Sequence, residues 1–252
     1  GANGVVLITT KSGAVSEKGK AKINVYATTE WNVFSKKFDL LDGVGYAMYQ
    51  NEDATLKGFK PKYHIDGKSV YPILYDADEN PTVGDLSLKT IDWQDEIYTV
   101  NLSHNEGVSI SGGNDKNKYY LSAGFSNQKG IVETTDIKRG DLRLNLNQDL
   151  NKRLKLDTRL GMMYQVGSFA QGGSKSGGQR SFTKQVLSYR PIPGFASSED
   201  DLELEVSNPY SWLTDFEDNT KEIRLNASLA ATYTLMQGLK FKSSIGIDYW
   251  KK

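Results

Sequence analysis

Seven stretches of this chain alternate apolar and polar residues with a period of two. The clearest runs from Ile223 to Leu235, with apolar residues at its odd positions and mostly polar ones at its even positions. Successive side chains of a strand point to opposite faces, so this period predicts a β-strand with one apolar and one polar face. The pattern also covers residues 22–31, 108–110, 119–125, 142–146, 154–164 and 239–249. We therefore predict an all-β, antiparallel fold of about seven alternating strands.

The segments between these strands are short and long in turn. Residues 112–118, 151–153 and 236–238 read as tight turns, whereas about 34–102 and 167–220 are long connections. Short turns at one end of the strands and long loops at the other are typical of outer-membrane β-barrels.

Each long connection contains one segment with helical spacing. Apolar residues of 40–53 recur near the helical period, which predicts a short amphipathic helix. Residues 181–195 predict a second helix, stopped by Pro191 and Pro193, because proline lacks the backbone N–H that a helix interior needs. The predicted loops are therefore partly helical.

Aromatic side chains lie near the strand ends, on the apolar parity. They are Trp31, Tyr119, Tyr164, Tyr233, Phe241 and Tyr249. From Phe241 to Tyr249, at about 3.3 Å per residue and a tilt near 40°, the strand spans roughly 20 Å, close to the height between the aromatic girdles of a barrel. A large soluble β-sandwich would show the same alternation, so at this point both folds remain open.

Composition excludes several functions. The chain has 252 residues, with 31 Lys and Arg against 31 Asp and Glu, so its net charge gives no indication of a polyanionic partner such as nucleic acid. It has no cysteine, which excludes disulfides, thiolate zinc sites and cysteine nucleophiles. The longest purely apolar run, 5–8, is far shorter than a membrane-spanning helix.

Two loop segments resemble ligand-binding motifs without matching them. Gly167 and Gly172 have the outer spacing of a phosphate-binding loop, but the motif needs its lysine directly after the second glycine, and Gly173-Ser174 intervene. Residues 76–85 resemble half of a calcium loop, with Pro81 where that motif requires glycine. We favour a Gly/Ser-rich loop and a solvated acidic loop, respectively.

Catalytic constellations are equally weak. The only histidines, His64 and His104, have no second ligand at metal-site spacing, and acidic runs such as 199–201 are expected by chance in a chain that is 25% charged. We therefore expect no enzyme activity, no metal and no cofactor.

Several strings, in order along the chain, resemble SusC/RagA-type TonB-linked outer-membrane transporters. Residues 2–13 (ANGVVLITTKSG) look like the end of their plug domain, and 39–52 (DLLDGVGYAMYQNE) is similar to the helix after their first barrel strand. Residues 91–98 (IDWQDEIY) and 108–148 resemble further family segments, and YRPIPGF and NPY match loop features. Together these strings make the resemblance specific.

The resemblance implies a domain division and a function. Residues 1–19 would be the end of the plug and the hinge, and 20–252 the amino-terminal part of the transmembrane barrel. The parent protein would import glycan oligomers or peptides across the outer membrane of a Gram-negative bacterium. It would be energised by the TonB complex through the plug and would work with a SusD-like surface lipoprotein. The alternative is a soluble β-sandwich module of a secreted or surface protein that binds glycans through Trp93 or Trp212.

If the strands form a barrel, side chains of one parity face lipid and those of the other face the water-filled lumen. Lipid contact is expected for Leu142, Leu144, Leu146, Leu225, Leu229, Ile245 and Ile247. The six aromatic residues named above are expected in the girdles. Lys155, Arg159, Arg224 and Lys242 have the opposite parity and are expected to face the lumen. Substrate contacts are expected in the long loops, where the sequence singles out no residue.

Overall fold

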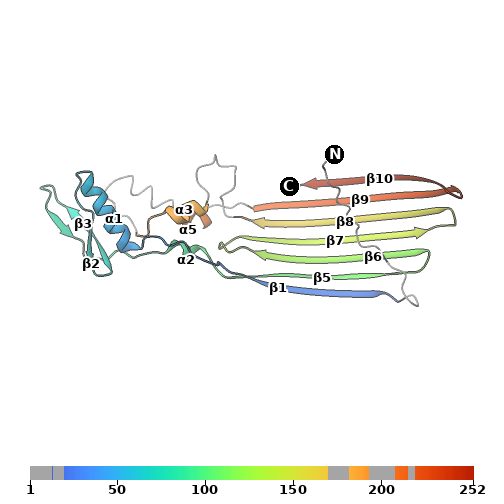
Figure 1. Ribbon diagram of the computed structural model, residues 1–252, viewed down its shortest axis with the longest axis horizontal. Helices are drawn as coiled ribbons and strands as arrows, with labels where there is room; N and C mark the ends of the chain where they lie inside the picture. The colour runs from blue at the N-terminus through green and yellow to red at the C-terminus, as the bar shows by residue number, and fades with distance from the viewer. Residues whose placement is uncertain (1–12, 14–19, 170–181, 193–207, 215–218) are drawn as a thin grey trace.

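The computed structural model describes residues 13, 20–169, 182–192, 208–214 and 219–252. Of residues 1–19, the predicted end of the plug and the hinge, only Gly13 belongs to this part of the chain. Within it, one large sheet carries a set of short helices and a small second sheet at one end of its strands (Figure 1).

All seven predicted strands form, and they pair into one antiparallel sheet in the order β1-β5-β6-β7-β8-β9-β10. Their bounds are β1 (Lys22–Asn32), β5 (Asn101–Gly113), β6 (Asn117–Lys129), β7 (Asp136–Asp149), β8 (Leu154–Ser168), β9 (Asn219–Met236) and β10 (Leu239–Lys251). Strands that follow one another along the chain are also neighbours in this sheet. The one exception is the step from β1 to β5, between which three shorter strands form the separate small sheet. This meander is the topology expected of an up-and-down barrel wall.

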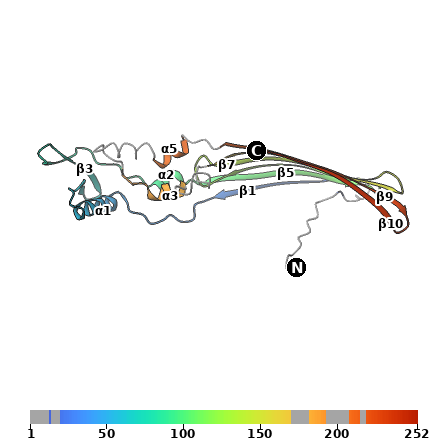
Figure 2. The ribbon, with the colours of Figure 1, turned by 90° about the horizontal axis from the view of Figure 1, so that it is seen from above.

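The sheet is a single curved layer when it is seen edge-on (Figure 2). Its register is continuous, with one irregularity at Leu239/Lys240, beside the turn between β9 and β10. Within the described residues no second sheet covers either face, as a sandwich would require. The sandwich alternative therefore lacks its second layer.

The connections divide between the two ends of the strands as predicted. Residues 114–116, 150–153 and 237–238 join strands at one end. Residues 33–100, 130–135 and 169–218 join them at the other, which lies on the left in Figure 1. Because every strand reverses direction, all of the long connections meet at this end, which we call the connection end.

Short elements fold within the long connections. They are α1 (Gly43–Leu56), β2 (Tyr63–Asp66), β3 (Ser69–Tyr75), β4 (Pro81–Val83), α2 (Trp93–Ile97), α3 (Phe182–Ser188) and α5 (Pro209–Thr214). The two helices expected from the sequence correspond to α1 and α3. None of the described helices is long and apolar enough to span a membrane.

Helix α1 packs on the three-stranded sheet β2-β3-β4. Asp42 caps its first turn, because the carboxylate Oδ1 accepts a hydrogen bond from Gly45 N–H at 2.7 Å. Ala47 of the helix packs with Tyr63, Val70 and Ile192, all of which are buried. Ile192 belongs to the second long connection, so this core already joins two distant parts of the chain.

A second small core lies nearer to the large sheet. Ile97 of α2 packs with Phe182 and Val186 of α3 and with Leu213 of α5, and Val132 from the connection between β6 and β7 lies against them. Three separate connections thus share one apolar core. The buried residues of the described chain lie chiefly in these two cores, whereas the large sheet exposes both of its faces.

Candidate functional site

The register of the large sheet places most of the apolar residues of its strands on one face. One row across the sheet reads Ile110, Leu121, Leu144, Leu160 and Ala227, each paired with the next. Paired residues share a face, and every second residue of a strand joins them. We call this the apolar face and the opposite one the polar face.

The residues predicted to contact lipid all lie on the apolar face. Leu142 pairs with Met162, which pairs with Leu225, and Leu225 pairs in turn with Tyr249. Ile247 pairs with Ala227, a residue of the row given above. Their side chains are exposed, with 52% of Leu142 and 67% of Ile247 accessible to solvent in this chain. A groove of about 410 Å³ crosses this face between Leu121 and Ile247. An apolar surface this extended requires a partner or a lipid phase.

The six predicted girdle residues share the apolar face. Tyr164 pairs with Ile223 near the connection end, and Tyr233 pairs with Phe241 near the turn end. The rings therefore fall toward both ends of an apolar band, the arrangement that aromatic girdles have in a barrel.

The polar face carries the four residues predicted to face the lumen. Arg224 forms an ion pair with Asp248 at 2.9 Å, and Lys155 forms one with Asp149 at 2.9 Å. Lys155 and Lys242 occupy the positions on either side of Thr232. Between these charges the face is lined largely by serine, asparagine, threonine and glycine, which are suited to contact with water.

Two glycines let side chains lie flat along the polar face. A Cβ at Gly107 would meet the ring of Tyr26 at 2.6 Å, and one at Gly161 would meet the amide of Asn226 at 2.5 Å. Tyr26 and Asn226 belong to neighbouring strands, at the positions paired with these glycines. Glycine inside a strand often marks such a close approach. Here it leaves room for the side chains of Tyr26 and Asn226 to lie over the neighbouring strand.

At the connection end, Gln94 fastens the chain that leaves β1. Its side chain is only 3% exposed. Its Nε2 donates to Phe38 O at 2.9 Å, and its Oε1 accepts from Phe38 N–H at 2.9 Å. Trp93 beside it donates from Nε1 to Arg190 O at 2.8 Å and packs edge-on against Tyr189. These contacts tie both long connections to α2.

A cavity of about 400 Å³ opens beside this clamp. Its lining combines aromatic rings, among them Trp93 and Tyr189, with the carboxylates of Asp39, Asp42 and Asp92. Burial opposes the ionisation of Asp92, but hydrogen bonds from Lys37 and from Gln94 N–H outweigh it and keep the pKa of Asp92 below its usual value. The rings offer apolar faces to a ligand, whereas Asp42 Oδ1 is bound to Gly45 N–H and the two oxygens of Asp92 are bound to Gln94 N–H and Lys37.

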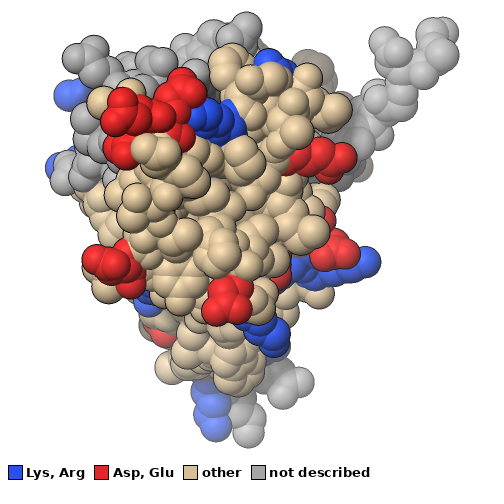
Figure 3. Space-filling view, turned by 90° about the vertical axis from the view of Figure 1, so that its left-hand side faces the viewer, with Lys and Arg blue, Asp and Glu red and all other residues tan. Residues whose placement is uncertain are grey.

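The surface around the connection end is acidic in composition. Residues 33–100 contain seven lysines against twelve aspartates and glutamates. Viewed onto this end, the molecule shows carboxylates around a largely uncharged surface (Figure 3). A second cavity, of about 610 Å³, lies where the ends of β1, β6, β7 and β8 meet, between Trp31 and Phe169.

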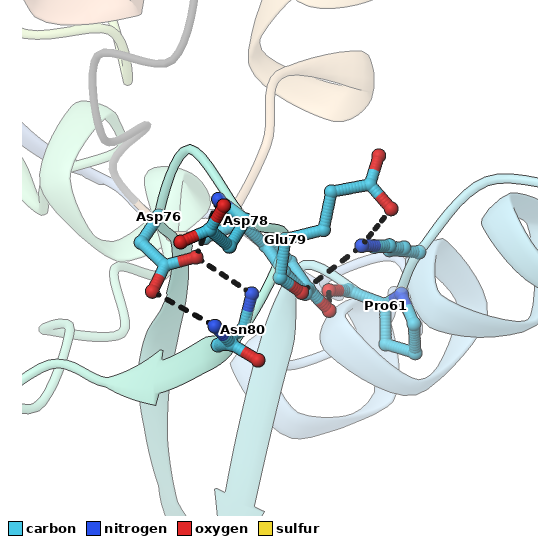
Figure 4. Close-up of polar contacts among 7 residues, drawn as sticks. Pro61, Asp76, Asp78, Glu79 and Asn80 are labelled. Carbon is cyan, nitrogen blue, oxygen red and sulfur yellow. Dashed lines mark hydrogen bonds and ion pairs between the residues drawn. The ribbon is translucent and has the colours of Figure 1, made fainter.

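The acidic segment that resembled a calcium loop forms the hairpin tip between β3 and β4 (Figure 4). Asp76 Oδ1 accepts from Asp78 N–H at 3.0 Å and from Asn80 N–H at 2.8 Å, and Oδ2 accepts from Asn80 Nδ2 at 3.1 Å. Lys60 reaches the tip through Glu79, at 2.8 Å. Both carboxylate oxygens of Asp76 therefore bind donors of its own loop.

The other candidate sites are spread apart or fall outside the described residues. His64 lies in β2 beside Tyr71, while His104 lies on the large sheet with Glu106 Oε1 at 2.8 Å from Nδ1. Among described residues no group of three His, Cys, Asp or Glu side chains is placed to hold a metal ion. Residues 170–181, which include the glycine-rich candidate, the acidic run 199–201 and the side chain of Trp212 lie outside the described part.

Sequence reasoning missed the small sheet, α2, α5 and the Gln94 clamp. The strands β2 and β4 are only four and three residues long, too short for a period of two to stand out. Asp92 before Trp93 is a helix-capping signal for α2, with its Oδ1 accepting from Gln94 N–H. That signal was available in the sequence.

Comparison with known proteins identifies several relatives. No family model matches the sequence. TonB-dependent receptor P3 of Formosa agariphila is 27% identical over 98% of this chain, and TonB-dependent receptor SusC of Bacteroides thetaiotaomicron is 28% identical over 70% of it. This chain spans 22% and 15% of the length of these two relatives.

Solved structures show the same fold. The RagAB peptide transporter matches with a TM-score of 0.66 at 19% identity, over 95% of this chain and 29% of that one. The RagAB peptide importer in its open-open state matches with a TM-score of 0.63 at 21% identity, over 98% of this chain and 29% of that one. The proteins with these names are receptors and transporters rather than enzymes.

Proposed function

We propose that this chain is part of a SusC/RagA-type TonB-dependent receptor, and that its large sheet forms part of the barrel wall of an outer-membrane importer. One observation carries the proposal. Seven consecutive strands keep a continuous register that gives a face of leucine, isoleucine and aromatic rings and a face of small polar and charged residues. Lipid on one side and water on the other is the environment in which such a wall is stable.

The two faces then take distinct roles. The leucines and isoleucines of the apolar face contact acyl chains, and its aromatic residues lie at the membrane interfaces. Lys155, Arg159, Arg224 and Lys242 face the interior, where their charges remain solvated. Residues 1–19 are the end of the plug and the hinge, and 20–252 are barrel. The support is strand parity together with the order along the chain of the strings that resemble this family.

Transport is driven by the TonB complex acting on the plug, and a SusD-like lipoprotein covers the connection end. The cargo is a glycan oligomer or a peptide. Support comes from the names of the relatives, one of them a peptide transporter, and from the aromatic and carboxylate cavity beside Trp93. That cavity lies at the connection end, where an incoming substrate first meets the protein.

The experiment uses the full-length protein in its own cells. Membrane fractionation should recover it in the outer membrane, with the SusD-like lipoprotein copurifying. Cells that carry it should take up labelled oligosaccharides or peptides only while the TonB complex is intact. Recovery as a soluble monomer would support the soluble glycan-binding module instead. Uptake that persists without TonB would contradict the energised mechanism.

A further inference from the structure

Lysines on the apolar face gather at one end of the strands. The register places Lys138 of β7 and Lys221 of β9 in one row, joined through Val166. Lys251 of β10 pairs with Ile223, two residues from Lys221, and Lys129 of β6 pairs with Asp136, two residues from Lys138. All four lysines are exposed. We call Lys129, Lys138, Lys221 and Lys251 the lysine strip.

The charge on this face is confined to the connection end. Among described strand residues of the apolar face, the carboxylates are Glu106 and Asp136, which lie at this same end. The carboxylate of Asp136 forms an ion pair with Lys138 at 3.1 Å. At the turn end the same face finishes in uncharged residues such as Gln148 and Leu154. Four lysines against two carboxylates leave this edge of the face cationic.

Aromatic rings and an open notch lie next to the lysine strip, toward the middle of the strands. Their row runs through Glu106, Phe125, Gly140, Tyr164, Ile223 and Lys251, so it also holds one carboxylate and one lysine of the strip. Both rings are 42% exposed, and a Cβ at Gly140 would meet nothing within 4 Å. Passing along the face, the sheet presents aliphatic side chains, then the aromatic rings with Lys251 in their row, then the other three lysines. This is the order in which a bilayer presents acyl chains, interface and headgroups.

We propose that the lysine strip binds the phosphate groups of lipid headgroups in the leaflet on the side of the long connections. This inference rests on the proposed function, because it takes the apolar face to be in lipid. A lysine ammonium is a compact charge with three donors and binds phosphate well. Lys138 and Lys221 are two strand spacings apart, roughly 10 Å, so the strip is wide enough for a headgroup with more than one phosphate.

A lipid explains the surroundings of the strip better than a free anion. Free phosphate would need a polar pocket, whereas the lysine strip adjoins exposed rings of Phe125 and Tyr164 and the notch at Gly140. An acyl chain or the body of a headgroup packs there while its phosphates reach the lysines. The absence of charge from the turn end of the same face makes the site specific to one leaflet.

The test measures lipid binding by the full-length protein in detergent, using native mass spectrometry with bisphosphorylated lipid A as the probe. The strip variant carries K129Q, K138Q, K221Q and K251Q. Its matched control carries K116Q, K118Q, K152Q and K240Q, which remove four lysines at the turn end. We expect the strip variant to bind about tenfold more weakly or worse, because each lysine near a charged lipid surface contributes to binding. The control should bind as the unmodified protein does.

A further variant with arginine at all four strip positions should retain binding, since it keeps the charges. Each variant is first checked for a folded barrel by its heat-dependent migration in gels. Equal binding by the strip variant, equal binding of lipid A without phosphates, or full competition by inorganic phosphate would each overturn the inference. These outcomes leave the proposed function intact. That function fails separately, if the unmodified protein is recovered outside the membrane.

Discussion

Gln94 shows how one side chain positions a long connection. It is nearly buried, and its amide forms both a donor and an acceptor bond to the backbone of Phe38. A buried amide with two backbone partners acts like a short piece of sheet, fixing the direction of a chain that has no regular structure of its own. This contact joins the segment leaving β1 to the helix that precedes β5.

Replacing Gln94 by leucine should release the segment around Phe38. Both hydrogen bonds to the Phe38 backbone disappear, and we expect the free energy of unfolding of this region to fall by about 1–2 kcal/mol. The fall is no larger because water can replace these bonds at Phe38, which is exposed. Limited trypsin digestion of the full-length protein should show faster cleavage after Lys36 and Lys37. Gln94→Glu keeps the acceptor for Phe38 N–H but sets a carboxylate oxygen against Phe38 O, so it should speed cleavage as well. Unchanged cleavage in Gln94→Leu would show that the clamp is not what holds this segment.

The hairpin tip at Asp76 should depend on pH. The backbone N–H of Asn80, then its side-chain amide, stabilise the carboxylate and hold the pKa of Asp76 below its usual value. A depressed pKa in the folded state means that the stabilisation is present above the ordinary carboxyl pKa, about 3.9, and is lost as pH falls through the folded value. Hydrogen exchange at the tip, corrected for its intrinsic pH dependence, should therefore speed up below about pH 4.

Asp76→Asn supplies the control for this effect. It retains one oxygen for the N–H groups of Asp78 and Asn80 but places a second NH₂ group opposite Asn80 Nδ2. We expect faster exchange than in the unmodified protein at neutral pH, and a weaker acceleration on acidification. The same acid response in both proteins would assign it to another group, such as Glu79, whose pKa is lowered by Lys60.

At the scale of the strand, neighbouring residues of β9 lie in opposite environments. Leu229 and Ser228 are consecutive, both exposed, and point to the apolar and polar faces respectively. Leu229 lies near the middle of β9, which places it near the centre of the apolar band. The pair compares the two faces at nearly the same depth.

Leu229→Arg should destabilise the folded barrel by about 2–4 kcal/mol, the cost of a cation on the lipid face near the midplane. Ser228→Arg should cost far less, because the polar face is the one proposed to line a water-filled lumen. The measurement is the free energy of folding of the full-length protein into lipid vesicles, from urea titrations. Equal costs would contradict the assignment of the faces. Asn145 would be a poorer control for the polar face, because it is only 5% exposed.

Over the whole molecule, the long connections fold as one unit against the end of the sheet. Ile97, which is fully buried, contacts residues of α3 and α5 from the second long connection. Val132, from the connection between β6 and β7, packs beside them. The connections are therefore joined by a shared core rather than being independent loops. A site at this end draws its residues from segments far apart in the chain, as with Trp93 and Arg190, which are 97 positions apart.

Ile97→Ala should loosen both long connections together. Removing a buried isoleucine side chain costs about 2–5 kcal/mol, and here the cavity opens in the core that they share. Hydrogen exchange of the full-length protein should increase in 93–98 and in 182–188 alike. Leu86→Ala is the control, because Leu86 is 81% exposed and outside both cores. An increase confined to the first connection would show that the two fold separately.

The strands and their faces followed from the sequence alone. A period of two requires only that successive side chains point to opposite faces, so strands such as 223–235, with their parity, were predictable residue by residue. A helix near α1 was also predicted, but not as an amphipathic one: Leu40 and Leu41 precede it, Met48 is exposed, and its buried residues are Gly43, Ala47 and Ala54. Local periodicity was therefore enough for the strands of the large sheet and for the choice of residues on each face.

The tertiary structure alone decided what the connections do. That Gln94 meets Phe38, that Trp93 reaches Arg190, and that lysines from β6 to β10 form one strip depend on contacts between residues far apart in the chain. No local period encodes such contacts, because they arise only when loop closure brings distant side chains into one core or one row of a sheet. The sequence determined which solvent each strand face prefers, and the folded chain determined which residues act together.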